Sequence, residues 1–320
     1  MDQDRFRKML DTRLTRRSAL QTAGAVGAAG ILAPHVLASA SAQGAEDPFD
    51  YPDLAITAVE YAFEMPTTAE AGWTHVLMDN QGMMDHHAMF LRPQEGSTIE
   101  DIQAALEGGD FGALFAAAMS AGGPNVGPGH QASVAMNLEA GNYLVICAIP
   151  NEEGIPHFAL GMQTVLDVTE ASADSTPPEA DATVNLVEMT FEGLPTDATA
   201  GTHVWEVTNA GTQIHEVVIL QLAEGVTIDQ AIQGFSEPPP SASPVASPVV
   251  DQTVASPAAE SPAGPPFEAI GGTAPMSPGE TNYAVLDLTA GDYIAICFLP
   301  DAETGVPHFA MGMIAGFTVS

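Results

Sequence analysis

The chain contains the same sequence pattern twice. The first copy has Gly-x-Tyr-x-x-x-Cys-x-x-Pro over 141–150, and the second copy repeats it over 291–300. Each is followed by Pro-His-Phe-Ala-x-Gly-Met, at 156–162 and again at 307–313. A duplication with a period of about 130 residues is far longer than the roughly 20–50 residues of a solenoid repeat. The duplication therefore predicts two homologous domains in tandem.

Short strand-like segments separated by turn residues fill both copies. In the second copy, 183–191 and 203–208 alternate apolar and polar residues, and 216–222 is a nearly continuous apolar run. Two further segments, 281–288 and 292–298, read as strands joined by a Thr-Ala-Gly turn. Many short strands with Gly, Pro and Asn between them predict an all-β fold of the β-sandwich type.

One short helix is expected in each copy. The first begins at Thr98, with Asp101 placed to complete a capping box, and continues to Leu106. Its counterpart in the second copy covers 227–232.

The composition along the chain suggests where the domains begin and end. We expect domain 1 at 46–169, a linker at 170–182 and domain 2 at 183–320. Residues 236–266 are rich in proline, serine and alanine and are expected to be a disordered insertion in domain 2.

The N-terminus resembles an export signal. Six of the seven Lys and Arg residues lie in the first 17 positions, and Arg16-Arg17 precede an apolar, Gly- and Ala-rich stretch. Small-residue cleavage sites follow, so 1–42 is interpreted as a twin-arginine signal peptide, with an uncleaved anchor as the alternative. We expect the protein in the periplasm, at the cell surface or outside the cell, with no integral membrane segment after cleavage.

The charge balance limits the partners. The formal net charge is −34, and after cleavage at Ala42 the only basic side chain is Arg92. Such a chain lacks the cations that neutralise phosphate, so nucleic acid is not expected as a partner. A basic protein partner fits this charge, as does simple solubility in a salty or acidic exterior.

The two cysteines occupy equivalent places in the two repeats, each ahead of a histidine and a methionine. Thiolate, imidazole and thioether are ligands that suit copper, and copper electron-transfer sites use two His and one Cys with a weak axial Met. An earlier histidine in each copy, in the aligned segments 80–86 and 209–215, completes such a set. The expected metal ligands are His86, Cys147, His157 and Met162 in the first copy, and His215, Cys297, His308 and Met313 in the second. A disulfide between the cysteines is the alternative.

These motifs resemble those of the cupredoxins, the blue copper proteins of the plastocyanin and azurin type. The resemblance rests on Asn-x-Gly-x-x-x-His, Gly-x-Tyr-x-x-x-Cys-x-x-Pro and His-x-x-x-Gly-Met, and it covers roughly 55–168 and 184–319. It implies two Greek-key β-sandwiches, each with one copper that cycles between Cu(I) and Cu(II). In cupredoxins the Cys and second His are only a few residues apart, whereas here they are ten and eleven apart. The extra residues are expected to loop out.

Several functions are compatible with these motifs. The first is exported electron transfer with a redox protein as partner. The second is copper binding and delivery to an exchange partner, for which the loop residues Met83, Met84 and Met89 could capture Cu(I). The adjacent His87 should point away from His86 by strand alternation. A metal-free binding module is a third possibility. The sequence contains no His-x-His motif, so we expect the chain not to be a copper oxidase or reductase.

Overall fold

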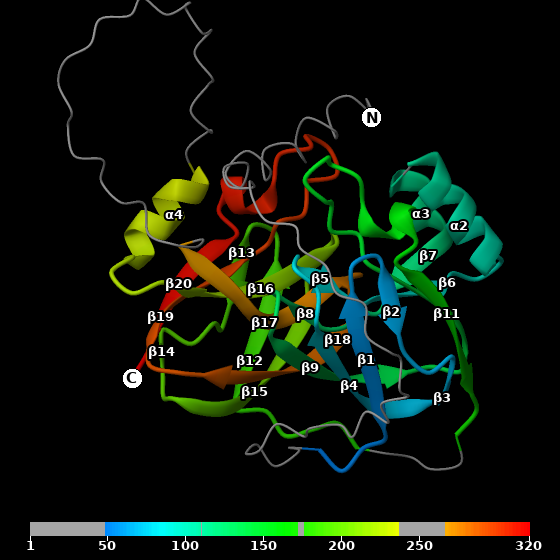
Figure 1. Ribbon diagram of the computed structural model, residues 1–320, viewed down its shortest axis with the longest axis horizontal. Coiled ribbons are helices and arrows are strands. Elements are labelled where there is room, and N and C mark those ends of the chain that lie inside the picture. Colours follow the sequence, from blue (N-terminus) through cyan, green and yellow to red (C-terminus); the bar gives the residue numbers. More distant parts are fainter. Residues whose placement is uncertain (1–48, 110, 172–175, 237–265) are drawn as a thin grey trace, which may run out of the picture.

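The computed structural model describes residues 49–109, 111–171, 176–236 and 266–320. They form mainly β-strands with a few short helices (Figure 1), which confirms the expected all-β fold. The expected signal peptide and nearly all of the expected insertion lie outside the described residues. The proposed domain boundaries and the export signal therefore stay predictions.

Short strands dominate the first repeat. Its strands are β1 (Asp53–Val59), β2 (Ala62–Glu64), β3 (Thr68–Glu70), β4 (Gly72–Asn80), β5 (His86–His87), β6 (Met89–Pro93), β7 (Ala118–Ser120), β8 (Asn125–Val126), β9 (Gln131–Leu138), β10 (Gly141–Ile146) and β11 (Gln163–Thr169). Its helices are α2 (Ile99–Gly108), α3 (Phe111–Ala117) and the 3-10 helix η2 (His157–Leu160).

The second repeat has a similar but shorter set of elements. Its strands are β12 (Ala182–Val187), β13 (Thr190–Glu192), β14 (Asp197–Ala198), β15 (Gly201–Asn209), β16 (His215–Leu222), β17 (Phe267–Met276), β18 (Thr281–Leu288), β19 (Gly291–Ile296) and β20 (Ile314–Val319). Its helices are α4 (Ile228–Ser236) and the 3-10 helix η3 (His308–Met311).

Each repeat is a β-sandwich, and the two sandwiches share a sheet. One face of the first repeat is the sheet β3-β11-β10-β6-β7, and one face of the second is β14-β20-β19-β16-β17. The opposing sheet runs β13-β12-β15-β18-β9-β4-β1-β2, because β18 pairs antiparallel with β9. In both repeats the first strand pairs in parallel with a later one, β1 with β4 and β12 with β15, and a parallel pair requires a crossover connection.

A second contact joins the repeats beside the shared sheet. Ala121 pairs with Met276, and Pro124 pairs with Thr273, as isolated antiparallel bridges. The buried Asn282 side chain accepts a hydrogen bond from the Gly123 N–H at 2.9 Å and donates one to the Ala121 carbonyl at 2.9 Å. The polar groups at this junction are therefore paired, as buried polar groups must be.

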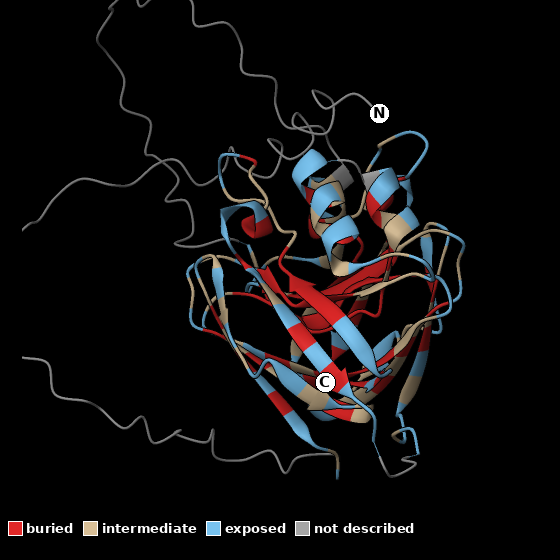
Figure 2. Ribbon diagram, turned by 90° about the vertical axis from the view of Figure 1, so that its right-hand side faces the viewer, coloured by how far each residue is buried: buried red, intermediate tan, exposed pale blue. Residues whose placement is uncertain are grey.

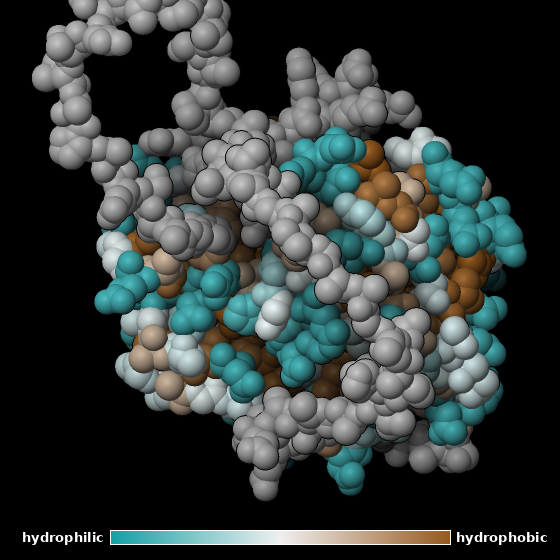
Figure 3. All heavy atoms as spheres, in the orientation of Figure 1, coloured by the Kyte–Doolittle hydropathy of each residue, from teal (hydrophilic) through white to brown (hydrophobic). Residues whose placement is uncertain are grey.

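Buried side chains follow the inner strands, and exposed ones follow the outer edges and the helices (Figure 2). The main hydrophobic core includes residues from both repeats and contains both cysteines and both of the expected methionine ligands. On the face shown in Figure 3, hydrophilic and apolar residues are interspersed. Among the described residues, no helix is both long and apolar enough to cross a membrane.

The alternating segment 183–191 is a hairpin and not one strand. It breaks after Val187, and β13 returns antiparallel to β12. The turn places Met189 at a φ of 62°, and the equivalent Tyr61 of the first repeat has a φ of 64°. The turn shifts the alternation by one position, because Leu186 and Phe191 pair across it and are both buried although they are five positions apart.

The expected helix of the first repeat is confirmed with its cap. The Thr98 hydroxyl accepts from the Asp101 N–H at 3.2 Å, and the Asp101 carboxylate accepts from the Thr98 N–H at 2.9 Å. Thr227 and Gln230 form the same reciprocal pair before α4. The helix α3 was not predicted, although Asp110 directly precedes it in the sequence and aspartate is a preferred N-cap residue.

We expect Thr98→Ala to destabilise the protein by about 1 kcal/mol, because the Asp101 N–H at the helix start loses its hydroxyl acceptor. The change is measured as a shift in the urea midpoint. Ser97→Ala, one residue outside the cap, serves as the control and should leave the midpoint unchanged. Equal midpoints for the two variants would contradict the cap assignment.

Candidate metal centres

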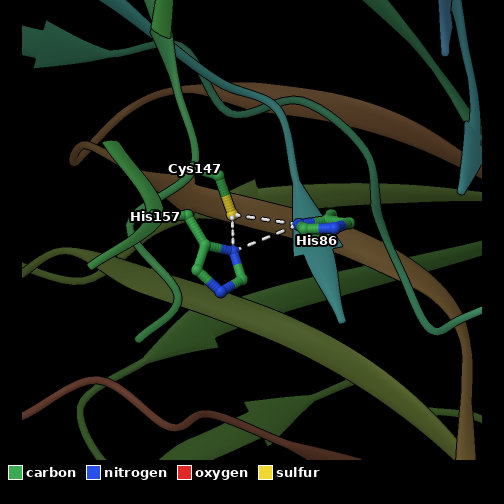
Figure 4. A group of neighbouring side chains, drawn as sticks. All are labelled: His86, Cys147 and His157. Carbon is green, nitrogen blue, oxygen red and sulfur yellow. Dashed lines mark hydrogen bonds between the residues drawn. The ribbon is translucent and has the colours of Figure 1, made fainter. Parts of the chain in front are cut away.

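His86, Cys147 and His157 meet inside the first sandwich (Figure 4). His86 opens β5, Cys147 directly follows β10, and His157 opens η2. The His86 Nδ1 atom lies 3.1 Å from His157 Nδ1 and 3.8 Å from Cys147 Sγ, and Cys147 Sγ lies 3.4 Å from His157 Nδ1. All three residues have no exposed surface. Three donor atoms thus converge on one enclosed point.

A small closed loop makes this convergence possible despite the long Cys-to-His gap. The His157 N–H donates to the Ile149 carbonyl at 2.9 Å, and Pro150 pairs with Pro156. The residues between fold into a turn that Gly154, at a φ of 78°, completes. The Phe158 N–H also donates to the Cys147 carbonyl at 2.8 Å. The insertion therefore loops out as expected and leaves His157 beside Cys147.

The second repeat builds the same group from His215, Cys297 and His308. Nδ1 of His215 lies 3.2 Å from Nδ1 of His308, and Cys297 Sγ lies 3.4 Å from His308 Nδ1. The loop closes in the same way, with the His308 N–H donating to the Leu299 carbonyl at 2.8 Å. All three side chains are buried.

Burial keeps the imidazoles of these groups uncharged at neutral pH. It lowers the pKa of His86 to about 4, and it lowers the pKa of His157 to about 4 together with the neighbouring His86. The pKa of His308 is likewise lowered to about 4, first by burial and then by His215. Burial raises the pKa of the Cys147 thiol to about 12. Neutral imidazoles offer lone pairs to a metal, and a bound metal displaces the thiol proton.

The donor sets fit a copper ion. Donors 3.1–3.8 Å apart can share one ion at the bond lengths of about 2.0–2.3 Å that imidazole nitrogen and thiolate sulfur form with a borderline metal. Two His and one Cys are the planar ligands of copper electron-transfer sites. Within the described residues, these two groups are the clusters of His, Cys, Asp and Glu able to hold a metal.

The two expected methionine ligands are placed by backbone bonds to the other ligands. The Met162 N–H donates to the His157 carbonyl at 3.0 Å, and the Met162 carbonyl accepts from the Cys147 N–H at 3.1 Å. Met313 has the same bonds to His308 and Cys297, at 2.9 and 3.1 Å. Both methionines are fully buried. Their role as weak fourth ligands stays a prediction.

A glutamate lies close to the first histidine of each group, Glu60 near His86 and Glu188 near His215. The sequence did not lead us to assign these glutamates a role. Glu188 Oε1 lies 3.8 Å from Nε2 of His215, and it accepts hydrogen bonds from the Thr212 and Gln213 N–H groups. The Thr212 N–H in particular lowers the pKa of Glu188 to about 2. Glu60 accepts from the Met83 N–H in the first repeat, and this bond lowers its pKa. Both glutamates occupy equivalent positions in aligned segments of the duplication. This alignment was the sequence signal from which a role beside the histidines could have been predicted.

In each repeat, the side chain that follows the first histidine accepts a hydrogen bond from the N–H of the residue that follows the cysteine. His87 Nε2 accepts from the Ala148 N–H at 2.9 Å, so His87 turns away from the metal group as expected. In the second repeat Glu216 Oε1 accepts from the Phe298 N–H at 3.1 Å. The two repeats thus make the same hydrogen bond with different acceptors, an imidazole in the first repeat and a carboxylate in the second.

No protein-family model and no curated protein sequence matches the chain. Among solved structures, auracyanin B is 18% identical and covers 45% of this chain and 93% of its own, with a TM-score of 0.27. Auracyanin A, a "blue" copper protein from Chloroflexus aurantiacus, is 21% identical and covers 37% of this chain and 99% of its own, with a TM-score of 0.24. At these identities the likeness concerns the fold alone.

Together with the sandwiches, the duplicated His-Cys-His groups confirm the resemblance drawn from the motifs. The chain is cupredoxin-like in fold and ligand set. The cupredoxin-like groups also exclude the disulfide alternative, because Cys147 and Cys297 lie in separate groups and neither forms a disulfide.

The expectation that the chain is not an enzyme is wrong. Solved structures matched by this chain include a multicopper oxidase and the copper nitrite reductase of Nitrosomonas europaea. The reductase is 13% identical and covers 84% of this chain and 93% of its own, with a TM-score of 0.22. One fold can host both electron carriers and enzymes, so the missing His-x-His motif does not separate them.

Three further histidines of the described residues, His75, His130 and His203, are not members of the two cupredoxin-like groups. His130 and His203 contact acidic side chains, Glu268 at 3.4 Å and Asp181 at 3.7 Å. His75 is buried, and its Nδ1 atom lies 3.3 Å from an Asp53 carboxylate oxygen.

The absence of a side chain at Gly123 lets its backbone pack closely against Ala88, which follows the strand β5 that contains His86. A Cβ at Gly123 would stand 1.9 Å from the Ala88 carbonyl oxygen, and its φ is 129°. We expect Gly123→Ala to cost on the order of 3 kcal/mol of unfolding free energy, from strain and overlap together. Gly129→Ala is the matched control: its φ is 74° and nothing lies within 4 Å. Similar urea midpoints for both would show that overlap with Ala88 is unimportant.

Proposed function

We propose that this chain is an exported copper protein that transfers electrons, with one copper ion held by each repeat. The observation that carries the proposal is the duplicated, buried His-Cys-His group with neutral imidazoles. The ligands would be His86, Cys147 and His157 in the first repeat and His215, Cys297 and His308 in the second, with Met162 and Met313 as weak fourth ligands.

Copper would supply a one-electron change between Cu(I) and Cu(II). The chain itself would hold the donors in one arrangement for both states. Backbone bonds from Cys147 to Met162 and from His157 to Ile149 fix the ligand loop against the core strand. Full burial of the cysteines keeps water away from the sulfur. A rigid, dry site changes little between oxidation states, which favours electron transfer.

The surface around the late histidines would receive a redox protein. Leu160 follows His157 in η2, and Val306 and Met311 flank His308; all three are large apolar residues with exposed side chains. The strongly acidic chain favours a partner with a basic rim around an apolar contact. Export rests on the twin-arginine pattern at the N-terminus and would place this partner outside the cytoplasm.

Copper binding and delivery is the second candidate. The observation that favours it is Met83, which is 76% exposed in the loop that leads to His86. A thioether at this position could accept Cu(I) from a donor before the ion enters the buried group.

The test is a titration of the mature protein with Cu(II), followed by visible absorption. An intense thiolate-to-copper band that saturates at two equivalents supports electron transfer. If copper binds without this band and exchanges quickly with a chelator, delivery is the better assignment. If copper does not bind, both candidates are wrong and the fold serves as a metal-free module.

A further inference from the structure

The two metal groups share their ligands but differ in the charges around them. The equivalent positions next to the ligands are His87 and Glu216 after the first histidine, and Asn151 and Asp301 in the Cys-to-His loop. Each difference places a carboxylate in the second repeat where the first has a side chain without negative charge. Glu216 and Asp301 are each only 5% exposed.

Both carboxylates are held by contacts that tie them to the ligand residues. Glu216 follows the ligand His215 and accepts from the Phe298 N–H, next to Cys297. Asp301 accepts from the Gln213 side chain at 2.9 Å, which bridges the loop before His215 to the loop before His308. Hydrogen bonds from Thr304 and Gln213 lower the pKa of Asp301 to about 2, so it is ionised at neutral pH.

The first repeat reproduces the loop geometry without the charge. The Asn151 side-chain oxygen accepts from the Glu153 N–H at 2.9 Å and the Ile155 N–H at 3.0 Å. The Asp301 carboxylate accepts from the Glu303 N–H at 3.2 Å and the Thr304 N–H at 2.7 Å. Because an amide oxygen can close such a loop, the charge of Asp301 is not required for its fold.

Two differences in the opposite direction are weaker. The first repeat has Asp85 before His86, where the second has Ile214, and it has Glu152 after Asn151, where the second has Ala302. Asp85 and Glu152 are both exposed, so water and salt weaken the effect of their charges on the first group. Asp85 still acts on that group, because its charge, after burial, helps to raise the pKa of the Cys147 thiol. Glu216 and Asp301 are nearly buried, where the same charge acts through a lower effective dielectric constant. Glu60 in the first repeat and Glu188 in the second occupy equivalent positions, so their charges do not contribute to a difference between the two centres.

We infer that the two copper centres have different reduction potentials, with the Glu216 and Asp301 carboxylates lowering the potential of the second centre below that of the first. Negative charge near the metal stabilises Cu(II) relative to Cu(I). One electron from a redox partner would therefore reduce the copper of the first centre, and a second electron would reduce that of the second. This inference rests on the proposed function.

The experiment is spectroelectrochemistry of the copper-loaded protein, following the thiolate band. Cys297→Ala isolates the first centre, and Cys147→Ala isolates the second. We expect a lower potential for the second centre. In the Cys147→Ala background, the double variant Glu216→Gln/Asp301→Asn should raise it towards that of the first. In the Cys297→Ala background, Asn151→Asp should lower the potential of the first.

Glu224→Gln is the charge control. It removes one negative charge from an exposed position past the far end of β16, whose end lies roughly 20 Å from Glu216, so neither potential should move. Circular dichroism of each variant checks that it folds. If the double variant does not fold, Asn151→Asp still tests the effect of the charge on the potential independently. Equal potentials, or a second centre that the charge changes leave unmoved, would overturn the inference while the thiolate band still supports the proposed function. Loss of the band from the parent protein would overturn both.

Discussion

Replacing Cys147 by alanine should remove half of the thiolate-to-copper absorption and lower the copper capacity from two tight sites to one. The thiolate is the donor responsible for the band, and an alanine offers no ligand. Cys297→Ala should have the same effect through the other group, because the two cysteines lie in separate His-Cys-His clusters. The double variant should show no band. Visible titration with Cu(II) measures all three.

Met162→Leu is the matched control for these variants. It conserves the volume of a buried side chain beside the same ligands, so stability should fall by less than about 1.5 kcal/mol. As Met162 is predicted to be only a weak fourth ligand, the band should persist with an altered maximum. Loss of the whole band in either single cysteine variant would mean that the two repeats share one site, contrary to the structure.

Acid should destabilise the copper-free protein between pH 6.5 and about 4, through its buried histidines. His86, His157 and His308 have pKa values lowered to about 4 in the fold, mainly by burial, against 6.5 for an ordinary histidine. Between these values the unfolded chain binds protons that the folded chain does not. Stability is therefore complete above pH 6.5 and falls as the pH drops towards 4, by roughly 1–2 kcal/mol per histidine after allowance for solvent screening.

Thermal unfolding midpoints at pH 7, 5.5 and 4.5 measure this loss. Bound copper requires neutral imidazoles, so loading the protein should move the loss to lower pH. His86→Gln/His157→Gln should flatten the pH dependence of the copper-free protein, because two of the titrating groups are removed. Glu188 and Asp301, with pKa values near 2, add their own loss only at lower pH. A constant midpoint from pH 7 to 4.5 would contradict the prediction.

Much of the fold could be read from local patterns. The apolar run after His215 lies in β16, and the segments around 281–288 and 292–298 became β18 and β19 with the expected turn. The Thr98 cap was found because its signal is a pair of residues three apart. The break in 183–191 was missed because Val187, Met189 and Phe191 continue the apolar alternation through the turn. The helix α3 was missed because its 7 residues are too few to show a helical period.

The long gap between cysteine and histidine was the feature that motifs could not resolve. Spacing along the chain does not give distance in space when a loop can close on itself. Here the bonds of His157 to Ile149 and of His308 to Leu299 shorten the path, so the extra residues do not displace either ligand.

By itself, the sequence determined the duplication, the strand-rich architecture and the candidate ligand residues, because each is encoded in local composition or in a repeated motif. The tertiary structure decided what depends on contacts between distant residues. Only folding brings His86 within 3.8 Å of Cys147, 61 positions later. It also pairs β18 with β9 and sets Glu216 and Asp301 beside one metal group but not the other. Such contacts arise from packing and register, which no single segment specifies.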